Sequence, residues 1–156
     1  MPNPKLNSNN NMETYKSDKV IIDHNIDVVY SKLSDPRVFK AHIDENIDRL
    51  PAEAREHLEK VKFEEDGISV ESPMGALKLS VAESIEPTMV KYTAQQSPVP
   101  FGLTVNLEAI DEGHTQSVTE INIELPMMLR AMVGSKLSDG AKKLGEVIAQ
   151  LPYGNM

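Results

Sequence analysis

The chain has 156 residues, a net charge of −8 and 40% apolar residues, so it is long and apolar enough to form the core of one ordinary domain. The absence of cysteine excludes disulfides, thiolate catalysis and metal ligation through sulfur. No apolar run approaches the roughly 18 residues of a membrane span, and Lys and Arg are not clustered as they are on nucleic-acid-binding surfaces.

The N-terminal residues have the composition of a tail. Residues 1–11 are rich in Pro and Asn and nearly free of aliphatic side chains, so we expect them to be disordered and to precede a single domain over residues 12–156. They also lack the apolar stretch of a secretory signal. We therefore expect a cytoplasmic protein that does not insert into membranes and does not bind nucleic acid.

A strand and two short helices are predicted next. Residues 13–23 become apolar towards their end, which indicates a strand. Asn25 or Asp23 can cap a first helix, and Asp35 can cap a second helix that has Pro36 at its first position. The first helix is expected to bury Ile26, Val29, Tyr30 and Leu33. One face of the second helix is expected to consist of Val38, Phe39, His42 and Ile43.

A strongly charged helix is expected from Pro51 to Lys60. Its acid–base pairs at four-residue spacing, such as Glu56 with Lys60, contribute only about 0.3 kcal/mol each, which is typical of an exposed helix. The helix lies in a segment, residues 44–71, that has ten acidic and four basic side chains. This acidic face could bind a protein partner.

From residue 61 the apolar period changes from 3.6 to two, which predicts an antiparallel meander of six strands. Asp66-Gly67 is the strongest short hairpin signal in the chain. The stretches 76–86 and 101–111 would each extend roughly 35 Å at the usual rise per residue. A sheet with such long strands twists strongly and tends to curl.

The last apolar segment predicts a helix of about 25 residues that starts after Pro126 and covers the concave face of the sheet. Its stripe against the sheet would consist of Leu129, Val133, Leu137, Leu144, Ile148 and Leu151. Met127 and Met128 fall in the first turn, where the helix is expected to meet a cavity rim, and Met132 borders the stripe. Alternatively, these methionines are ordinary core residues. Gly140 costs the helix about 1 kcal/mol relative to Ala, so we expect it to leave room for a ligand or a close strand.

The order of elements and one local phrase resemble a known superfamily. The stretch VIIDHNIDVVYSKLSDPRVF (residues 20–39) is similar to the opening of START-like proteins, in which an apolar strand end leads into a helix that closes on a Leu-Ser-Asp-Pro-like turn. The resemblance covers roughly residues 13–151. The superfamily, also called SRPBCC, includes polyketide cyclases and lipid-transfer domains, so the resemblance specifies a fold better than a function.

The resemblance implies an α+β helix-grip fold. In this fold a curved antiparallel sheet of about seven strands wraps on a long C-terminal helix, and two short helices follow the first strand. A deep cavity between the sheet and the last helix usually holds an apolar or amphipathic ligand. The segment 44–60 departs from the superfamily, because it is longer and more acidic than a minimal member needs.

The polar candidates for this cavity have both a functional and an ordinary interpretation. His42 could act as a general base, since neutral imidazole is poised near pH 7, or it could simply hydrogen-bond to the backbone. Tyr30, Tyr92 and Gln96 could orient a ligand head group, or Tyr92 could be a core residue with its hydroxyl at the rim. The residues expected to line the cavity are Tyr30, Phe39, His42, Leu79, Tyr92, Gln96, Phe101, Leu103, Val105, Met128, Met132 and Gly140.

No motif in the sequence indicates a metal, a cofactor or an assignable catalytic residue. We predict the binding of a small hydrophobic or amphipathic ligand, lipid-like or polyketide-like, in the cavity between sheet and helix. Two alternatives remain open. One is an enzyme of the cyclase, dehydratase or isomerase type that uses His42, Tyr30 or Tyr92 as acid–base groups. The other is a protein–protein regulator that acts through the acidic face of residues 44–71.

Overall fold

The computed structural model describes residues 12–72, 75–94, 100–151 and 153. The predicted tail over residues 1–11, the turn at Pro73-Met74 and the loop that contains Gln96 and Pro98 lie outside the described residues. In chain order the elements are β1 (Met12–Lys16), β2 (Val20–Ile22), α2 (Ile26–Leu33), α3 (Pro36–Asn46), η1 (Ile47–Arg49), α4 (Ala52–Lys60), β3 (Val61–Phe63), β4 (Ile68–Ser72), β5 (Gly75–Ile85), β6 (Met89–Ala94), β7 (Phe101–Asp111), β8 (His114–Glu124) and α5 (Met127–Ala149).

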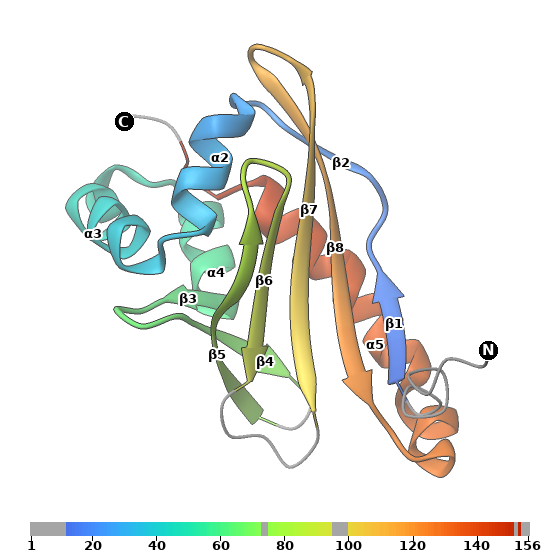
Figure 1. The fold of residues 1–156 in the computed structure, drawn as a ribbon. Coiled ribbons are helices and arrows are strands. Elements are labelled where there is room, and N and C mark those ends of the chain that lie inside the picture. The colour runs from blue at the N-terminus through green and yellow to red at the C-terminus, as the bar shows by residue number, and fades with distance from the viewer. Residues whose placement is uncertain (1–11, 73–74, 95–99, 152, 154–156) are drawn as a thin grey trace.

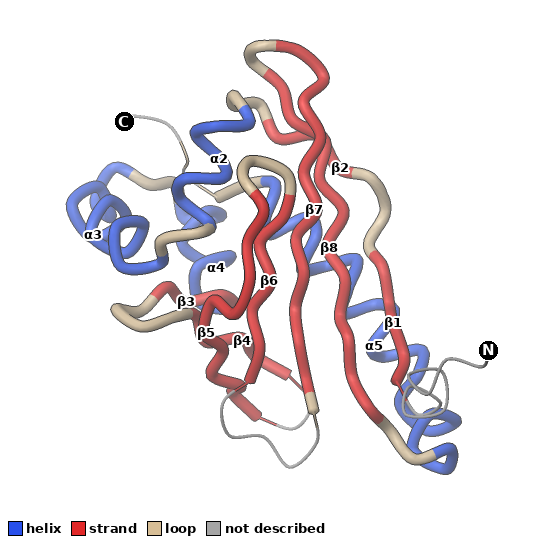
Figure 2. The backbone as a smooth tube through the Cα atoms, viewed as in Figure 1, coloured by secondary structure: helices blue, strands red, loops and turns tan. Residues whose placement is uncertain are grey.

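The strands form one antiparallel sheet in the order β1-β8-β7-β6-β5-β4-β3, and β2 also pairs with β8, so eight strands occupy seven positions. The sheet curls, and α5 crosses behind it (Figure 1). The shorter helices α2, α3 and α4 gather on the left of the sheet, where β3 lies (Figure 2). This arrangement confirms the predicted α+β helix-grip architecture, with a six-strand meander from β3 to β8 and a long C-terminal helix.

The predicted first strand is split into β1 and β2 by a bulge. The two strands pair with β8 in registers that differ by one residue. Between them, the N–H of Ser17 donates to the carbonyl of Thr119 over 2.8 Å, and Ser17 Oγ accepts a hydrogen bond from the N–H of Thr119 over 2.9 Å. Helix α5 passes the sheet at this point, with Gly145 directly against Ser17.

The two short helices begin at predicted caps. The side chain of Asn25 accepts a hydrogen bond from the N–H of Asp27 over 2.8 Å, and its Nδ2 donates to the carbonyl of Glu112 over 2.9 Å. The carboxylate of Asp35 accepts from the N–H of Val38 over 3.4 Å. Each capping bond joins residues only two or three positions apart in the chain, so both caps could be predicted from sequence.

Only part of the predicted apolar face of α3 is buried. Phe39 and Ile43 are buried and His42 is half-buried, whereas Val38 is 46% exposed. The prediction that Val38 shares this face is wrong, because adjacent helical residues point about 100° apart and Phe39 takes the inward direction. The ring of Phe39 packs 4.5 Å from that of Phe63.

Helix α5 follows Pro126 as predicted, and its C-terminal part is buried at Leu137, Leu144 and Ile148. Leu129, by contrast, is 40% exposed, so the prediction that it packs in the stripe against the sheet is wrong. Met132, which was predicted to border this stripe, is 68% exposed. The reason is visible in Figure 1, where the first turns of α5 extend past the end of β8 at the lower right. That end of the helix has less of the sheet to pack on.

Candidate functional site

A cavity of about 410 Å3 lies between α5 and the concave face of the sheet. Its apolar walls are Val70 from β4, Phe101 from β7, Ile121 from β8, and Leu137, Leu144 and Val147 from α5. The sheet order separates β4 from β8 by β5, β6 and β7, so the curl of the sheet is what brings both strands to one cavity. The cavity therefore depends on tertiary structure rather than on any continuous segment.

The spacing of residues along α5 explains how this helix forms one wall. Leu137, Gly140, Leu144 and Val147 recur at intervals of three and four, which places them on one face of a helix. A β-carbon added at Gly140 would meet only the Cδ1 atom of Ile121, at 3.9 Å, which is an ordinary contact. Gly140 is therefore a place where a missing side chain leaves space open in the cavity.

The mouth of the cavity carries charge. Glu59 and Lys60 come from the C-terminal end of α4, and Lys136 and Lys143 come from α5. All four residues are exposed. The site is thus an apolar cavity whose mouth holds three ammonium groups and one carboxylate.

Of the residues predicted from sequence to line a cavity, Phe101 and Gly140 do so. Leu79, Leu103 and Val105 point inward, as strand alternation indicated, but they are packed in the core and are not among the described lining residues. Phe39 is likewise fully buried in the core. Gln96 lies outside the described residues.

Tyr92 is fully buried, and its hydroxyl donates a hydrogen bond to the carbonyl of Leu33 at the end of α2. Burial raises the pKa of Tyr92 well above its ordinary value, so the phenol stays protonated. Tyr153 is placed similarly, with its hydroxyl donated to the carbonyl of Ile148 near the end of α5. Each tyrosine thus satisfies a carbonyl at a helix end, which would otherwise lack an intrahelical partner.

Tyr30 and His42 are half-buried and do not belong to the described lining of the cavity. The ring of His42 lies 6.4 Å from that of Phe39, in the region where the rings of Phe39 and Tyr153 stack 5.4 Å apart. The structure therefore does not bring Tyr30, His42 and Tyr92 together at the cavity of 410 Å3. Their roles in ligand binding remain predictions.

Among the residues that the structure describes, Met128 and Met132 do not line the cavity. Met128 occupies the first turn of α5, as predicted, and is 78% exposed. The cavity instead opens near the middle of the helix, around Gly140.

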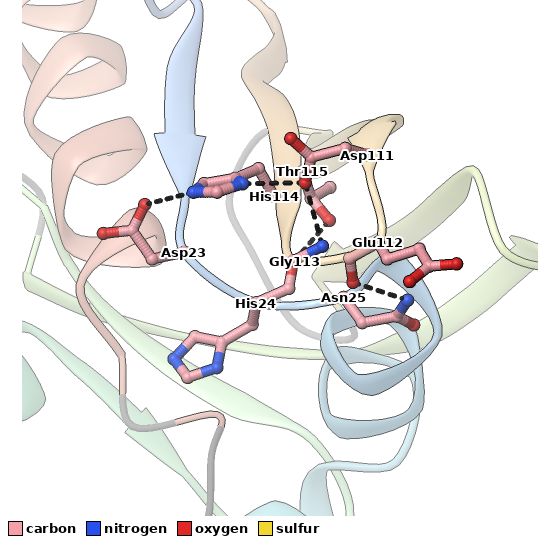
Figure 3. Close-up of polar contacts among 8 residues, drawn as sticks. All are labelled: Asp23, His24, Asn25, Asp111, Glu112, Gly113, His114 and Thr115. Atoms are coloured by element: carbon pink, nitrogen blue, oxygen red, sulfur yellow. Dashed lines mark hydrogen bonds and ion pairs between the residues drawn. The ribbon is translucent and has the colours of Figure 1, made fainter.

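A separate polar cluster ties the tip of the β7–β8 hairpin to the loop before α2 (Figure 3). His114 Nδ1 lies 2.7 Å from Asp111 Oδ1, and His114 Nε2 lies 3.7 Å from Asp23 Oδ1. The hydrogen bond that His114 donates to Asp111, together with the negative charge of that carboxylate, raises the pKa of His114, and the same bond lowers the pKa of Asp111. Thr115 Oγ1 donates to the carbonyl of His24 over 2.8 Å. The cluster holds the hairpin tip in place.

Comparison with solved structures shows which fold this is. The chain is similar to a START superfamily protein from Mycobacterium smegmatis, with a TM-score of 0.51, 17% identity, and coverage of 90% of this chain and 99% of that chain. The chain has the START-like helix-grip fold. It is also similar to norcoclaurine synthase from Thalictrum flavum in complex with dopamine and hydroxybenzaldehyde, with a TM-score of 0.59, 11% identity, and coverage of 89% and 85% of the two chains.

A third similar structure is the di-domain ARO/CYC protein BexL, with a TM-score of 0.55 and 15% identity. The match covers 99% of this chain and 54% of BexL. No family model and no curated protein matches the chain.

Most of the residues that line this cavity were not predicted from the sequence. Val70, Ile121 and Val147 were not singled out, although strand alternation and the spacing along α5 could have indicated them. The cationic mouth was also missed. Lys136 and Lys143 are seven residues apart and therefore lie on the same side of α5, but nothing local indicated that Lys60 of α4 lies at the same opening.

Across the described residues, no three His, Asp or Glu side chains are grouped to hold a metal ion. No helix within that part of the chain is long and apolar enough to cross a membrane.

Proposed function

We propose that this chain binds a small apolar or amphipathic molecule in the cavity between the sheet and α5. The observation that carries the proposal is the cavity itself: about 410 Å3 with six apolar side chains as its walls. Small-molecule sites are usually clefts of about 300–1,000 Å3 with mostly apolar walls. The volume is at the lower end of this range, which favours a ligand of modest size.

The chemistry of the walls sets the kind of affinity expected. Val70, Phe101 and Ile121 on the sheet offer no hydrogen-bonding side-chain groups, and neither do the leucines and valine of α5. Removing apolar ligand surface from water would contribute about 25 cal/mol per Å2. Affinity would therefore come mainly from burial of the ligand. The similar synthase structure in complex with dopamine and hydroxybenzaldehyde supports a small-molecule ligand for this fold.

The proposal is tested by filling the cavity from α5. We expect Gly140→Leu to weaken binding of the neutral apolar dye N-phenyl-1-naphthylamine about tenfold or more, because the new side chain would occupy space in the cavity. Gly140→Ala should bind the dye nearly as well as the original chain, since its β-carbon would make only an ordinary contact with Ile121. Dye fluorescence titrations measure both affinities.

Ala131→Leu is the matched control, because Ala131 is an exposed residue of the same helix outside the described lining. It adds the same side chain without filling the cavity, and the dye affinity should not change. Native mass spectrometry of the purified protein should in addition reveal a co-purifying small molecule that is lost in Gly140→Leu. Equal dye affinity in a correctly folded Gly140→Leu variant would rule out this cavity as the binding site.

A further inference from the structure

We propose that the ligand of this cavity is an anionic amphiphile whose head group is held at the mouth by Lys60, Lys136 and Lys143. This inference rests on the proposed function and specifies the class of ligand. The apolar tail would lie among the side chains of the walls, and the negatively charged head would face the ammonium groups.

The charge at the mouth is opposite to that of the whole chain. The chain has 24 acidic and 16 basic residues, for a net charge of −8. The mouth holds three lysines and one glutamate, Glu59, so its local charge is positive. Lining a cavity entrance with charge of one sign attracts ligands of the other sign and raises their local concentration.

The three lysines are also available for a ligand. Among the residues that the structure describes, Lys60, Lys136 and Lys143 form no ion pair, whereas Lys16, Lys40 and Lys78 are each paired with a carboxylate. The lysines of the mouth are exposed. A bound carboxylate or phosphate could therefore accept hydrogen bonds from them without breaking an existing pair.

The lysines approach the opening from two directions. Lys136 and Lys143 lie two turns apart on α5, with Gly140 between them. Lys60 ends α4, on a different element of the fold. A head group placed at the opening above the gap left by Gly140 would meet positive charge from both helices. The alternative is that the lysine stems only cover apolar surface while their ammonium groups remain in water.

Three ligands with the same tail distinguish these interpretations: decanoate, decan-1-ol and decyltrimethylammonium, each titrated by calorimetry below its micelle concentration. We expect decanoate to bind most tightly and the cation least tightly. The double variant Lys136→Gln/Lys143→Gln should weaken decanoate binding about tenfold and leave decan-1-ol binding unchanged. Added salt should reduce the affinity of the original chain for decanoate and affect its affinity for decan-1-ol little.

Lys19→Gln/Lys142→Gln is the matched control, because it removes the same charge from exposed lysines that do not line the cavity. Decanoate affinity should be nearly unchanged in it. An equal loss in both double variants would overturn the inference, since the effect would then come from net charge alone. Equal binding of decanoate and decan-1-ol to the original chain would also overturn it, while leaving the proposed function intact. If none of the three ligands binds, the inference fails, and the dye titrations of Gly140→Leu and Gly140→Ala then decide the proposed function separately.

Discussion

Gly145 of α5 lies so close to Ser17 that a β-carbon at position 145 would stand 2.6 Å from Ser17 Cβ and 2.7 Å from Ser17 Oγ. Ser17 also follows directly on β1, where the first strand is interrupted. Its hydroxyl oxygen accepts a hydrogen bond from the N–H of Thr119. The bulge, the glycine and the position of α5 are therefore one structural unit, and the cavity wall formed by α5 depends on it.

This contact predicts that Gly145→Ala destabilises the protein, although Ala is the better helix former. The overpacked β-carbon should cost about 1–3 kcal/mol, which exceeds the roughly 1 kcal/mol gained in helix propensity. Urea unfolding followed by circular dichroism measures the difference. Gly134→Ala is the control, because its β-carbon would come no closer than 3.6 Å to the hydroxyl of Tyr15. It should be neutral or stabilising, and combining Ser17→Gly with Gly145→Ala should recover part of the loss.

A stronger effect is expected at Gly67 in the β3–β4 turn. A β-carbon there would lie 1.9 Å from the carbonyl oxygen of Leu79, which is backbone and cannot rotate away. We expect Gly67→Ala to cost about 3 kcal/mol or more in the free energy of unfolding. Gly113→Ala in the β7–β8 turn should be tolerated, because its nearest neighbour would be 3.9 Å away. Similar losses in the two variants would show that the turn rather than the close approach to Leu79 requires glycine.

Tyr92→Phe should lower stability without changing ligand binding. The substitution leaves the buried carbonyl of Leu33 without its donor, at a cost of about 1–3 kcal/mol. The affinity for N-phenyl-1-naphthylamine should stay the same, since Tyr92 is not among the described lining residues. A loss of dye binding with unchanged stability would instead assign the hydroxyl to the ligand.

The same tyrosine predicts a loss of stability at alkaline pH. Burial raises the pKa of Tyr92 in the folded protein above its ordinary value, whereas the unfolded chain releases this proton near the ordinary value of about 10. The unfolded state therefore binds fewer protons above that pH, and the free energy of unfolding should fall as the pH rises past it. Tyr92→Phe should show a smaller decrease over the same pH range. Urea unfolding as a function of pH provides the test.

The hairpin tip should respond to pH in a different range. The raised pKa of His114 means that its stabilising effect is complete below the unfolded value of about 6.5 and is lost as the pH rises through the folded pKa. The lowered pKa of Asp111 has the opposite sign, so its contribution is lost as the pH falls through its folded value. NMR titration should place the pKa of His114 above the ordinary value, and Asp111→Asn should return it there. An unchanged pKa in Asp111→Asn would contradict this assignment.

Two hydroxyls on β8 should be dispensable for folding. Thr119 Oγ1 and Ser117 Oγ are buried and, within the described part of the chain, have no hydrogen-bonding partner. Because an unpaired buried hydroxyl is costly, Thr119→Val should stabilise the protein by about 1 kcal/mol. Thermal unfolding measures the change, with Thr104→Val as the contrast, since Thr104 Oγ1 donates to Asn122 Oδ1 over 3.1 Å. Destabilisation of Thr119→Val would indicate a partner for the hydroxyl.

The sequence by itself determined the elements of this fold and their order. The helices at Asn25 and Asp35, the meander from residue 61 and the long helix after Pro126 all follow from residues close together in the chain. Caps, turns and the two apolar periods act over a few residues, so they can be recognised without knowledge of the tertiary structure. The START-like arrangement followed from the order of these elements.

Only the tertiary structure decided where the cavity lies and which residues form it. Val38 and Met132 have the spacing of core residues, but both are exposed. Whether such a residue is buried depends on whether another element packs against its side of the helix. Gly140 was predicted to leave space, yet that space matters because the curl of the sheet brings Ile121 opposite it. The mouth likewise combines Lys60 with lysines more than seventy positions later in the chain. Contacts between distant segments have no local pattern, because they are fixed by how the whole sheet bends around α5.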